Sequence, residues 1–230
     1  MEVAPRTIFE IGAESLPDNE PVFRGQMARM TYSGFLEAFT KVHPIVPALL
    51  FVPVLAWTAW QGWLAQGPMV AAAFAVGLFF WALTEYTLHR FLFHIKVQGP
   101  ISQLIYLTFH GVHHMYPDDK MRLVMVPVVS IPLALMFYAL FGAVLPAGWV
   151  AGAFAGMVGG YLGYDYSHWA THWLKAPKSP LLAPVAKVLN RQRHRHMTHH
   201  FGDHSYGFGV STGFFDVVFG TVDPKRRGQG

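Results

Sequence analysis

The histidines are the residues of this chain best suited to chemistry, and ten of the thirteen fall into four short clusters. The clusters are His89 and His94; His110, His113 and His114; His168 and His172; and His196, His199 and His200. Most members lie three or four residues apart, a spacing that brings side chains to one face of a helix. Neutral imidazole is the commonest protein metal ligand, and ten rings exceed what one ion can bind. The pattern therefore predicts two metal ions.

The interval of five residues between His89 and His94 would separate their rings on a straight helix, so we expect the helix to loosen or bend there. Ten ligands on two ions would leave each ion five nitrogens and one open position, which fits octahedral iron with room for dioxygen. Imidazole also suits zinc, copper and nickel, so the ligand type alone does not select the metal. Three carboxylates are candidates for orienting the rings: Glu85, Asp165 and Asp203.

Four apolar segments lead into these clusters, and each has the length of about 20 residues that a membrane span needs. They lie near 45–64, 67–88, 123–145 and 147–166. With 53% hydrophobic and 13% charged residues, the chain is too apolar for an ordinary soluble domain. Core helices of a soluble bundle are the alternative, but segments that are apolar on all faces suit lipid better. Short links at 66–67 and 146–147 predict two helical hairpins.

Four spans would place both termini, the 89–122 loop and everything after residue 167 on one side of the membrane. All 17 Lys and Arg residues fall on that side, which the distribution of basic residues identifies as cytosolic. We therefore predict an all-α integral membrane protein, with four transmembrane helices in two hairpins and a cytosolic helical cap that holds a histidine-rich dimetal site. Its parts are an N-terminal cytosolic or interfacial segment (1–40), a membrane domain (41–222) and a basic tail (223–230).

Apolar residues before the first span recur at helical spacing among basic residues: Phe23, Met27, Met30, Phe35 and Phe39. This pattern predicts a helix that lies in the membrane interface, and packing against the cap is the alternative. The net charge of +4 could indicate nucleic-acid binding. The basic residues, however, stand among aromatic residues and histidines beside the spans, where contact with anionic lipid head groups explains them better. We expect no nucleic-acid partner.

The helix before His168 carries the best candidates for contact with a substrate. Tyr161, Tyr164 and Asp165 precede His168 by seven, four and three residues, so they share its face and point toward the metals. A carboxylate at membrane depth is costly and usually functional. We expect Asp165 to steady a ligand ring or, with the tyrosines, to position the amide or carboxyl head of a lipid. The alternative is that both tyrosines are interfacial aromatic residues.

Four stretches carry a family resemblance: Trp81–His94 (WALTEYTLHRFLFH), His110–Val124 (HGVHHMYPDDKMRLV), Tyr161–His172 (YLGYDYSHWATH) and His196–Gly220. Together they resemble the fatty acid hydroxylase superfamily, which includes sterol desaturase-like enzymes, over roughly residues 40–222. The histidine clusters are common to the superfamily. The motifs HRFLFH and DKMRLVM are most similar to those of fatty acid 2-hydroxylases that act on sphingolipid acyl chains.

The resemblance implies a membrane-bound monooxygenase that uses dioxygen and two electrons to insert one oxygen atom at carbon 2 of a fatty acyl chain, free or sphingolipid-linked. It also implies that the ten clustered histidines bind two ions, iron when active and sometimes zinc in purified protein. Many members carry a fused cytochrome b5 domain, for which the first 40 residues are too short. We therefore expect a separate electron donor, either cytochrome b5-like or a ferredoxin, and a bacterial inner membrane rather than the endoplasmic reticulum.

Other functions remain as alternatives. Sterol or carotenoid hydroxylation and acyl desaturation belong to the same superfamily and begin with the same hydrogen abstraction. A membrane metal transporter is a remote alternative from a different class. It would need polar ligands partway across the spans and on both sides, because the ion must travel. All four clusters lie on one predicted face, and the third span contains no charged residue, which favours an enzyme.

Overall fold

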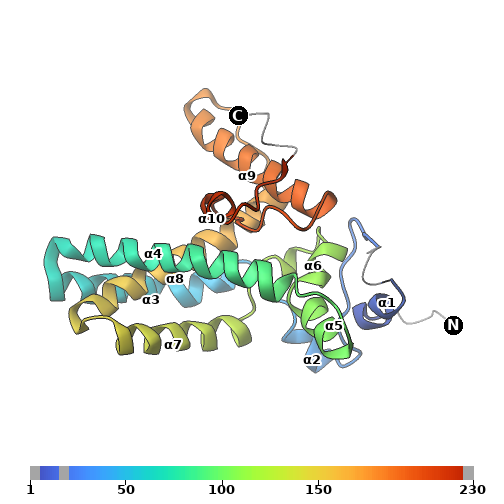
Figure 1. Ribbon diagram of the computed structural model, residues 1–230, viewed down its shortest axis with the longest axis horizontal. Coiled ribbons are helices and arrows are strands. Elements are labelled where there is room, and N and C mark those ends of the chain that lie inside the picture. Colours follow the sequence, from blue (N-terminus) through green and yellow to red (C-terminus); the bar gives the residue numbers. More distant parts are fainter. Residues whose placement is uncertain (1–5, 16–20, 225–230) are drawn as a thin grey trace.

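The computed structural model describes residues 6–15 and 21–224, and all regular structure within these ranges is helical. The prediction of an all-helical fold is confirmed. Four long helices lie lengthwise against one another, as Figure 1 shows. They are α3 (Ile45–Gln66), α4 (Val70–Thr87), α7 (Pro127–Val144) and α8 (Ala147–Trp173). The turn η1 (Gly67–Met69) joins α3 to α4, and only two residues separate α7 from α8.

Two segments of the described chain are long and apolar enough to cross a membrane, Ile45–Phe93 and Lys120–Val144. The first contains both α3 and α4, and the second contains α7. Side chains on the outer faces of these helices are apolar and more than 60% exposed, as in Trp57, Leu64 and Leu135. Such an outer surface suits contact with lipid.

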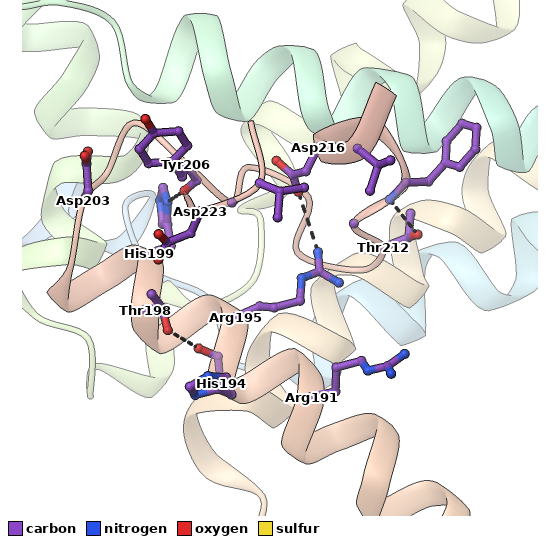
Figure 2. Close-up of a pocket in the computed structure, with 15 residues that line it drawn as sticks. Arg191, His194, Arg195, Thr198, His199, Asp203, Tyr206, Thr212, Asp216 and Asp223 are labelled. Carbon is purple, nitrogen blue, oxygen red and sulfur yellow. Dashed lines mark hydrogen bonds and ion pairs between the residues drawn. The ribbon is translucent and has the colours of Figure 1, made fainter. Parts of the chain in front are cut away.

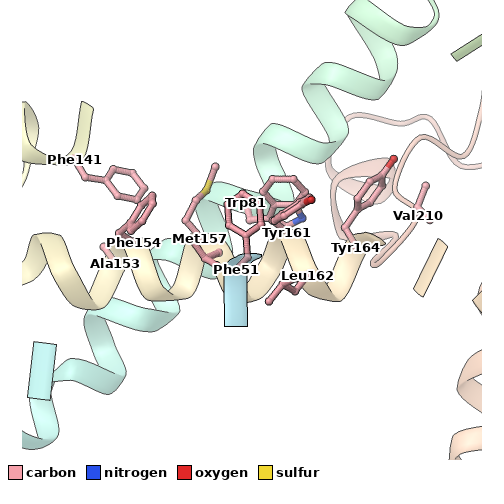
Figure 3. Packing of buried hydrophobic residues seen from close by; sticks show 11 residues of the cluster. Phe51, Trp81, Phe141, Ala153, Phe154, Met157, Tyr161, Leu162, Tyr164 and Val210 are labelled. Atoms are coloured by element: carbon pink, nitrogen blue, oxygen red, sulfur yellow. The ribbon is translucent and has the colours of Figure 1, made fainter. Parts of the chain in front are cut away.

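Helix α8 forms the centre of the bundle, where the backbone of α4 packs directly against it. A side chain on Gly77 of α4 would come within 1.8 Å of the carbonyl oxygen of Ala153, and one on Gly156 within 2.0 Å of that of Phe74. Small residues thus let the two backbones touch, as they commonly do between membrane helices. Figure 3 shows the buried apolar side chains that continue this packing along α8 toward the site.

Shorter helices gather at the end of the bundle where α4 and α8 finish, and they form the cap (Figure 1). In chain order the cap contains α1 (Ile8–Ser15), α2 (Gly34–Ala38), η2 (Leu88–Phe93), α5 (Pro100–Tyr106), η3 (Leu107–Gly111), α6 (Val112–Met115) and α9 (Ala183–Phe201). The short helix α10 (Phe214–Val218) packs against the side of α4. Two of these elements, η2 and η3, are π-helical.

The apolar pattern before α3 does not form one helix, so that prediction is wrong. Residues 21–33 contain no helix, and α2 covers only five residues. The reason is that the carboxylate of Glu37 accepts hydrogen bonds from the amides of Met30 and Thr31, which holds this backbone in an extended form. Met30 is buried in the cap whereas Phe35 is 73% exposed, so the pattern mixes cap packing with outward-facing residues.

Candidate metal centre

All ten clustered histidines meet in the cap, and their ring nitrogens form two groups. The five-histidine group consists of His113, His168, His172, His196 and His200, and the four-histidine group of His89, His94, His110 and His199. Within each group the ring nitrogens lie within 4.8 Å of one another. The tenth ring, that of His114, places its Nε2 2.9 Å from the Nε2 of His110. This arrangement provides two sets of imidazole donors, as the spacing predicts.

A π-helical turn brings His89 and His94 into the same group. In η2 the amide of His94 donates to the carbonyl oxygen of His89, five residues earlier, at 3.1 Å. A π-helical turn aligns residues five apart, which an α-helix separates. The prediction that the helix loosens between these two residues is confirmed. The second π-helical turn, η3, carries His110 and has no comparable signal in the histidine spacing.

The two clusters with the spacing His-x2-His-His each supply both groups. In one cluster His196 faces His200 at an Nε2–Nε2 distance of 3.0 Å, while His199 turns to His94 at 2.8 Å. Helical spacing alone would let His196 meet both neighbours, but only His200 belongs to its group. The same division separates His113 from the other two histidines of its cluster. On α6 and α9, histidines one or three residues apart diverge enough to reach different groups, so the two groups are adjacent.

Main-chain carbonyl groups fix the orientation of three of the clustered histidine rings. The Nδ1 atoms of His89, His168 and His199 donate to the carbonyl oxygens of Phe208, Leu123 and Tyr206, at 2.5, 2.8 and 2.8 Å respectively. A carbonyl oxygen only accepts, so the proton of each ring resides on Nδ1. The Nε2 lone pair of each ring is then directed into its group, which is the tautomer that a metal ligand needs.

Burial keeps these rings neutral. It lowers the pKa of His199 to about 4, although the hydrogen bond to Tyr206 acts in the opposite direction. Burial, reinforced by neighbouring imidazoles, also lowers the pKa values of five other rings well below the ordinary value: His110, His113, His114, His196 and His200. Because a metal ligand must be deprotonated, the cap holds these histidines in the form that binds an ion.

The distances between ring nitrogens fit metal ions. Six pairs of Nε2 atoms lie 2.8–3.0 Å apart. A neutral imidazole nitrogen carries either one proton or one lone pair. The Nε2 atoms of His110 and His196 each face two others, so they cannot satisfy both contacts unless a cation lies between the rings. For metal–nitrogen bonds of about 2.1 Å, adjacent ligands of an octahedron are about 3.0 Å apart and those of a tetrahedron about 3.4 Å. The spacing therefore fits octahedral ions better than tetrahedral ones.

Two of the predicted ring-orienting carboxylates, Glu85 and Asp165, contact the rings only indirectly, through main-chain loops. Glu85 accepts hydrogen bonds from the amides of Val210 and Ser211 at 2.6 and 2.8 Å, and Asp165 accepts from the amide of Met125 at 3.2 Å. Neither carboxylate hydrogen-bonds to a histidine ring in the described part of the chain. Each holds a loop whose carbonyl group holds a ring instead. The third candidate, Asp203, accepts from the amide of Ser205 at 2.9 Å.

Asp216 is a further buried carboxylate that the sequence analysis did not single out. Its two oxygens accept hydrogen bonds from the amides of Phe208 and Gly209, both at 2.9 Å. Asp216 and Glu85 thus hold the amides of residues 208–211, and we call residues 206–211 the histidine-orienting loop. The carbonyl groups of this loop accept from His89 and His199. The only signal for Asp216 in the sequence is its place in the stretch that carries the family resemblance.

An apolar cavity of about 740 Å³ leads to both groups of histidines. Its walls come mainly from α7, η2 and η3, and its polar end contains His110, His113, His168 and two predicted substrate residues, Tyr164 and Asp165. The third predicted residue, Tyr161, does not line this cavity. It lies in the packed core of the bundle with Phe51 and Trp81 (Figure 3).

The model of one protein family, described as fatty acid hydroxylase, matches residues 74–221. This range contains all ten clustered histidines and the histidine-orienting loop. The chain belongs to the fatty acid hydroxylase family. The family membership expected from the motifs is therefore confirmed.

Curated relatives of this fatty acid hydroxylase share its sequence over most of its length. A ceramide very long chain fatty acid hydroxylase, SCS7 of Saccharomyces cerevisiae, is 36% identical over 207 residues, which are 88% of this chain and 52% of the yeast protein. The fatty acid 2-hydroxylase of Homo sapiens is 31% identical over 230 residues, with 90% of this chain and 59% of the human protein covered. The chain spans little more than half the length of these relatives.

Two further similarities cover more of the related protein. The dihydroceramide fatty acyl 2-hydroxylase FAH1 of Arabidopsis thaliana is 30% identical over 211 residues, which are 90% of this chain and 85% of the plant protein. A solved structure described as full-length scs7p with only the hydroxylase domain visible superimposes with a TM-score of 0.76 at 35% identity. The superposition covers 86% of this chain and 74% of that one. The fold of this hydroxylase family member therefore has a close solved counterpart.

His204 is a residue of this fatty acid hydroxylase that the cluster pattern leaves out. A ring nitrogen of His204 lies within 4.8 Å of those of His114 and His199. Unlike the ten clustered histidines, His204 is more than one third exposed. It forms a smaller group with His114 and His199 at the outer edge of the four-histidine group.

Proposed function

We propose that this chain is a membrane-bound dimetal monooxygenase that hydroxylates carbon 2 of a fatty acyl chain, either free or sphingolipid-linked. One observation carries the proposal: the apolar cavity ends at His110, His113 and His168, which belong to both groups of histidines. A fatty acyl chain in this cavity would present its polar end to both ions. The names of the relatives, which include ceramide and fatty acid 2-hydroxylases, support the same substrate class.

The ten clustered histidines would hold two iron ions, and these would supply the activation of dioxygen when bound. With two electrons from a separate donor and two protons, one oxygen atom would enter the carbon–hydrogen bond and the other would leave as water. The residues of the chain bind and orient the substrate. The apolar walls from α7 hold the acyl tail and exclude water, while Asp165 and Tyr164 stand beside the reacting end and position the amide or carboxyl head.

The proposed setting is a membrane crossed by α3, α4, α7 and α8 in two hairpins, with the cap on the cytosolic side. The exposed apolar faces of α3 and α7 support the spans. Helix α8 is largely shielded by its neighbours, so it needs fewer apolar residues than they do. The absence of Lys and Arg from the two short links between the proposed spans, at 66–67 and 146–147, supports the orientation. The relatives named above are eukaryotic, and a bacterial inner membrane stays a prediction.

Lipid mass spectrometry of cells that express the chain tests this function. Cells with the unaltered chain should gain acyl chains with one oxygen atom added at carbon 2, and cells with His113→Ala should lose that product. His43→Ala is the matched control, because His43 lies outside both groups and accepts from the amide of Ile45 through Nδ1. New double bonds, oxidised sterols or no new product would each contradict the proposal.

A further inference from the structure

A second large cavity, of about 580 Å³, lies between α9 and the C-terminal segment 203–223 (Figure 2). It shares no residue with the apolar cavity that leads to the two groups of histidines. Only one clustered histidine, His199, contributes to its wall. This second cavity, which we call the α9 cavity, is therefore not used by the proposed reaction.

One end of the α9 cavity adjoins the surface that faces the membrane. Its wall includes Phe214 and Val217 of α10, which are 55% and 71% exposed. The next aromatic residue of α10, Phe215, contacts Phe79 with a ring-centroid distance of 5.6 Å. Phe79 lies halfway along α4, about 12 Å before its end at 1.5 Å per residue. Helix α10 thus lies beside the membrane segment rather than above it.

Basic side chains stand next to this apolar end. Arg195 already binds the carbonyl oxygen of Gly209 and lies 3.8 Å from the carboxylate of Asp216, so it serves the histidine-orienting loop. Arg191 and His194 line the same cavity, and their side chains form no hydrogen bond or ion pair with the residues that the structure describes. A guanidinium group in this position suits a phosphate, which it binds through two parallel hydrogen bonds.

The opposite end of the α9 cavity is acidic. Figure 2 shows Asp203, Tyr206 and Asp223 grouped around His199, away from Arg191. Between the apolar end and this acidic end, the wall carries Arg191, His194 and the ion pair of Arg195 with Asp216. A phospholipid with an amine in its head group has the same order of groups: acyl tails, phosphate and then a cationic nitrogen.

We propose that the α9 cavity binds the head group of a zwitterionic phospholipid from the leaflet on the cap side. The phosphate lies beside Arg191, the amine faces Asp203 and Asp223, and the tails follow the exposed face of α10. Bound there, the lipid covers the side of the cap that contains the histidine-orienting loop. The inference depends on the membrane position of α4 and not on the reaction that the metal centre performs.

Native mass spectrometry of the full chain, purified in detergent and mixed with phosphatidylethanolamine, tests the proposal. The unaltered chain should retain one lipid molecule. Arg191→Glu should lower the bound fraction at least tenfold, and Arg191→Gln should lower it less, because it removes the charge without reversing it. The matched control is Lys187→Glu, since Lys187 is exposed on α9 one turn earlier and does not line the cavity. It should retain lipid like the unaltered chain.

Equal retention by Arg191→Glu and Lys187→Glu would overturn the proposal. Phosphatidylglycerol, which has the phosphate without the amine, should bind more weakly than phosphatidylethanolamine, and equal or tighter binding would contradict the assignment of the acidic end. A third result would also overturn the proposal. If Arg191→Glu keeps the lipid but loses salt-sensitive binding of an acidic ferredoxin, the α9 cavity is a docking surface for an electron donor instead. Unchanged elution volume and metal content identify variants that fold.

Discussion

The ring of His89 donates through Nδ1 to the carbonyl oxygen of Phe208, 119 residues later in the chain, at 2.5 Å. This bond joins the first histidine cluster to the histidine-orienting loop, and the neighbouring carbonyl group of Tyr206 holds His199 in the same way. Two buried carboxylates hold the amides of that loop. The geometry of the four-histidine group therefore depends on residues that contact no metal ligand themselves.

Removal of Glu85 should loosen this arrangement. Glu85→Ala leaves the buried amides of Val210 and Ser211 without an acceptor, at a cost of about 1–3 kcal/mol for each group. We expect metal affinity at the four-histidine group to fall by about 10- to 100-fold. Metal content after dialysis against a graded chelator measures the effect. Glu10→Ala is the control, because the carboxylate of Glu10 accepts from the side chains of Thr7 and Tyr32 and lies outside both groups of histidines.

A second variant, Glu85→Gln, tests the same role of the histidine-orienting loop. Glu85→Gln keeps one oxygen acceptor, so its metal affinity should lie between those of the unaltered chain and Glu85→Ala. If Glu85→Ala binds two ions with unaltered affinity, the loop does not set the ring geometry.

The metal content of two histidine variants should distinguish a ligand ring from a neighbouring ring. His94 belongs to the four-histidine group, with its Nε2 2.8 Å from that of His199, whereas His204 stands exposed at the edge. His94→Ala should lose one ion per chain, because a ligand of the second ion is gone. His204→Ala should keep both. Elemental analysis of both purified variants measures this, and loss of an ion from His204→Ala would make that residue a ligand.

A larger residue in the wall of the acyl cavity should shorten the chains that react. Leu133 of α7 lines the cavity and is partly buried, so Leu133→Trp fills space that the tail would occupy. The product distribution should shift toward shorter 2-hydroxy acyl chains, as lipid mass spectrometry can measure. Leu135→Trp, on the exposed face of the same helix, is the control and should leave the distribution unaltered. An identical shift in both variants would argue against this position of the tail.

Acid should destabilise the metal-free protein between about pH 6.5 and pH 4. An exposed histidine has a pKa of about 6.5, whereas burial lowers the pKa of His199 to about 4. Across this window the unfolded chain takes up protons that the folded chain does not, so the free energy of unfolding falls as the pH drops. Above pH 6.5 these rings are neutral in both states, so they add no pH dependence to the free energy of unfolding. Thermal unfolding at stepped pH measures the effect, and a constant melting temperature from pH 6.5 to 4 would contradict it.

Much of the architecture is predictable because it depends on local composition and spacing. The apolar segments near 45–64 and 123–145 correspond to α3 and α7, since runs of that length and hydropathy have few other stable conformations. The π-helical turn between His89 and His94 follows from their interval of five. Residues close together in the sequence determine these features, so they can be predicted from one sequence.

Other features depend on contacts between distant residues, which spacing does not record. The division of His196 and His199 between two groups depends on how α9 lies against η2. The carboxylates of Glu85 and Asp216 reach amides in a loop, whereas sequence proximity pointed Glu85 toward the nearby ring of His89. The acyl cavity depends on the distance between α7 and the cap, which no residue pattern gives.

The number of metal ions bound by the folded chain tests the central claim most directly. Elemental analysis should be made on the full chain, purified in detergent, monodisperse and supplied with iron during expression. Two ions per polypeptide are expected, one for each group of histidines and their neighbour His114. One ion or none in correctly folded protein would contradict the dimetal centre and the function proposed from it.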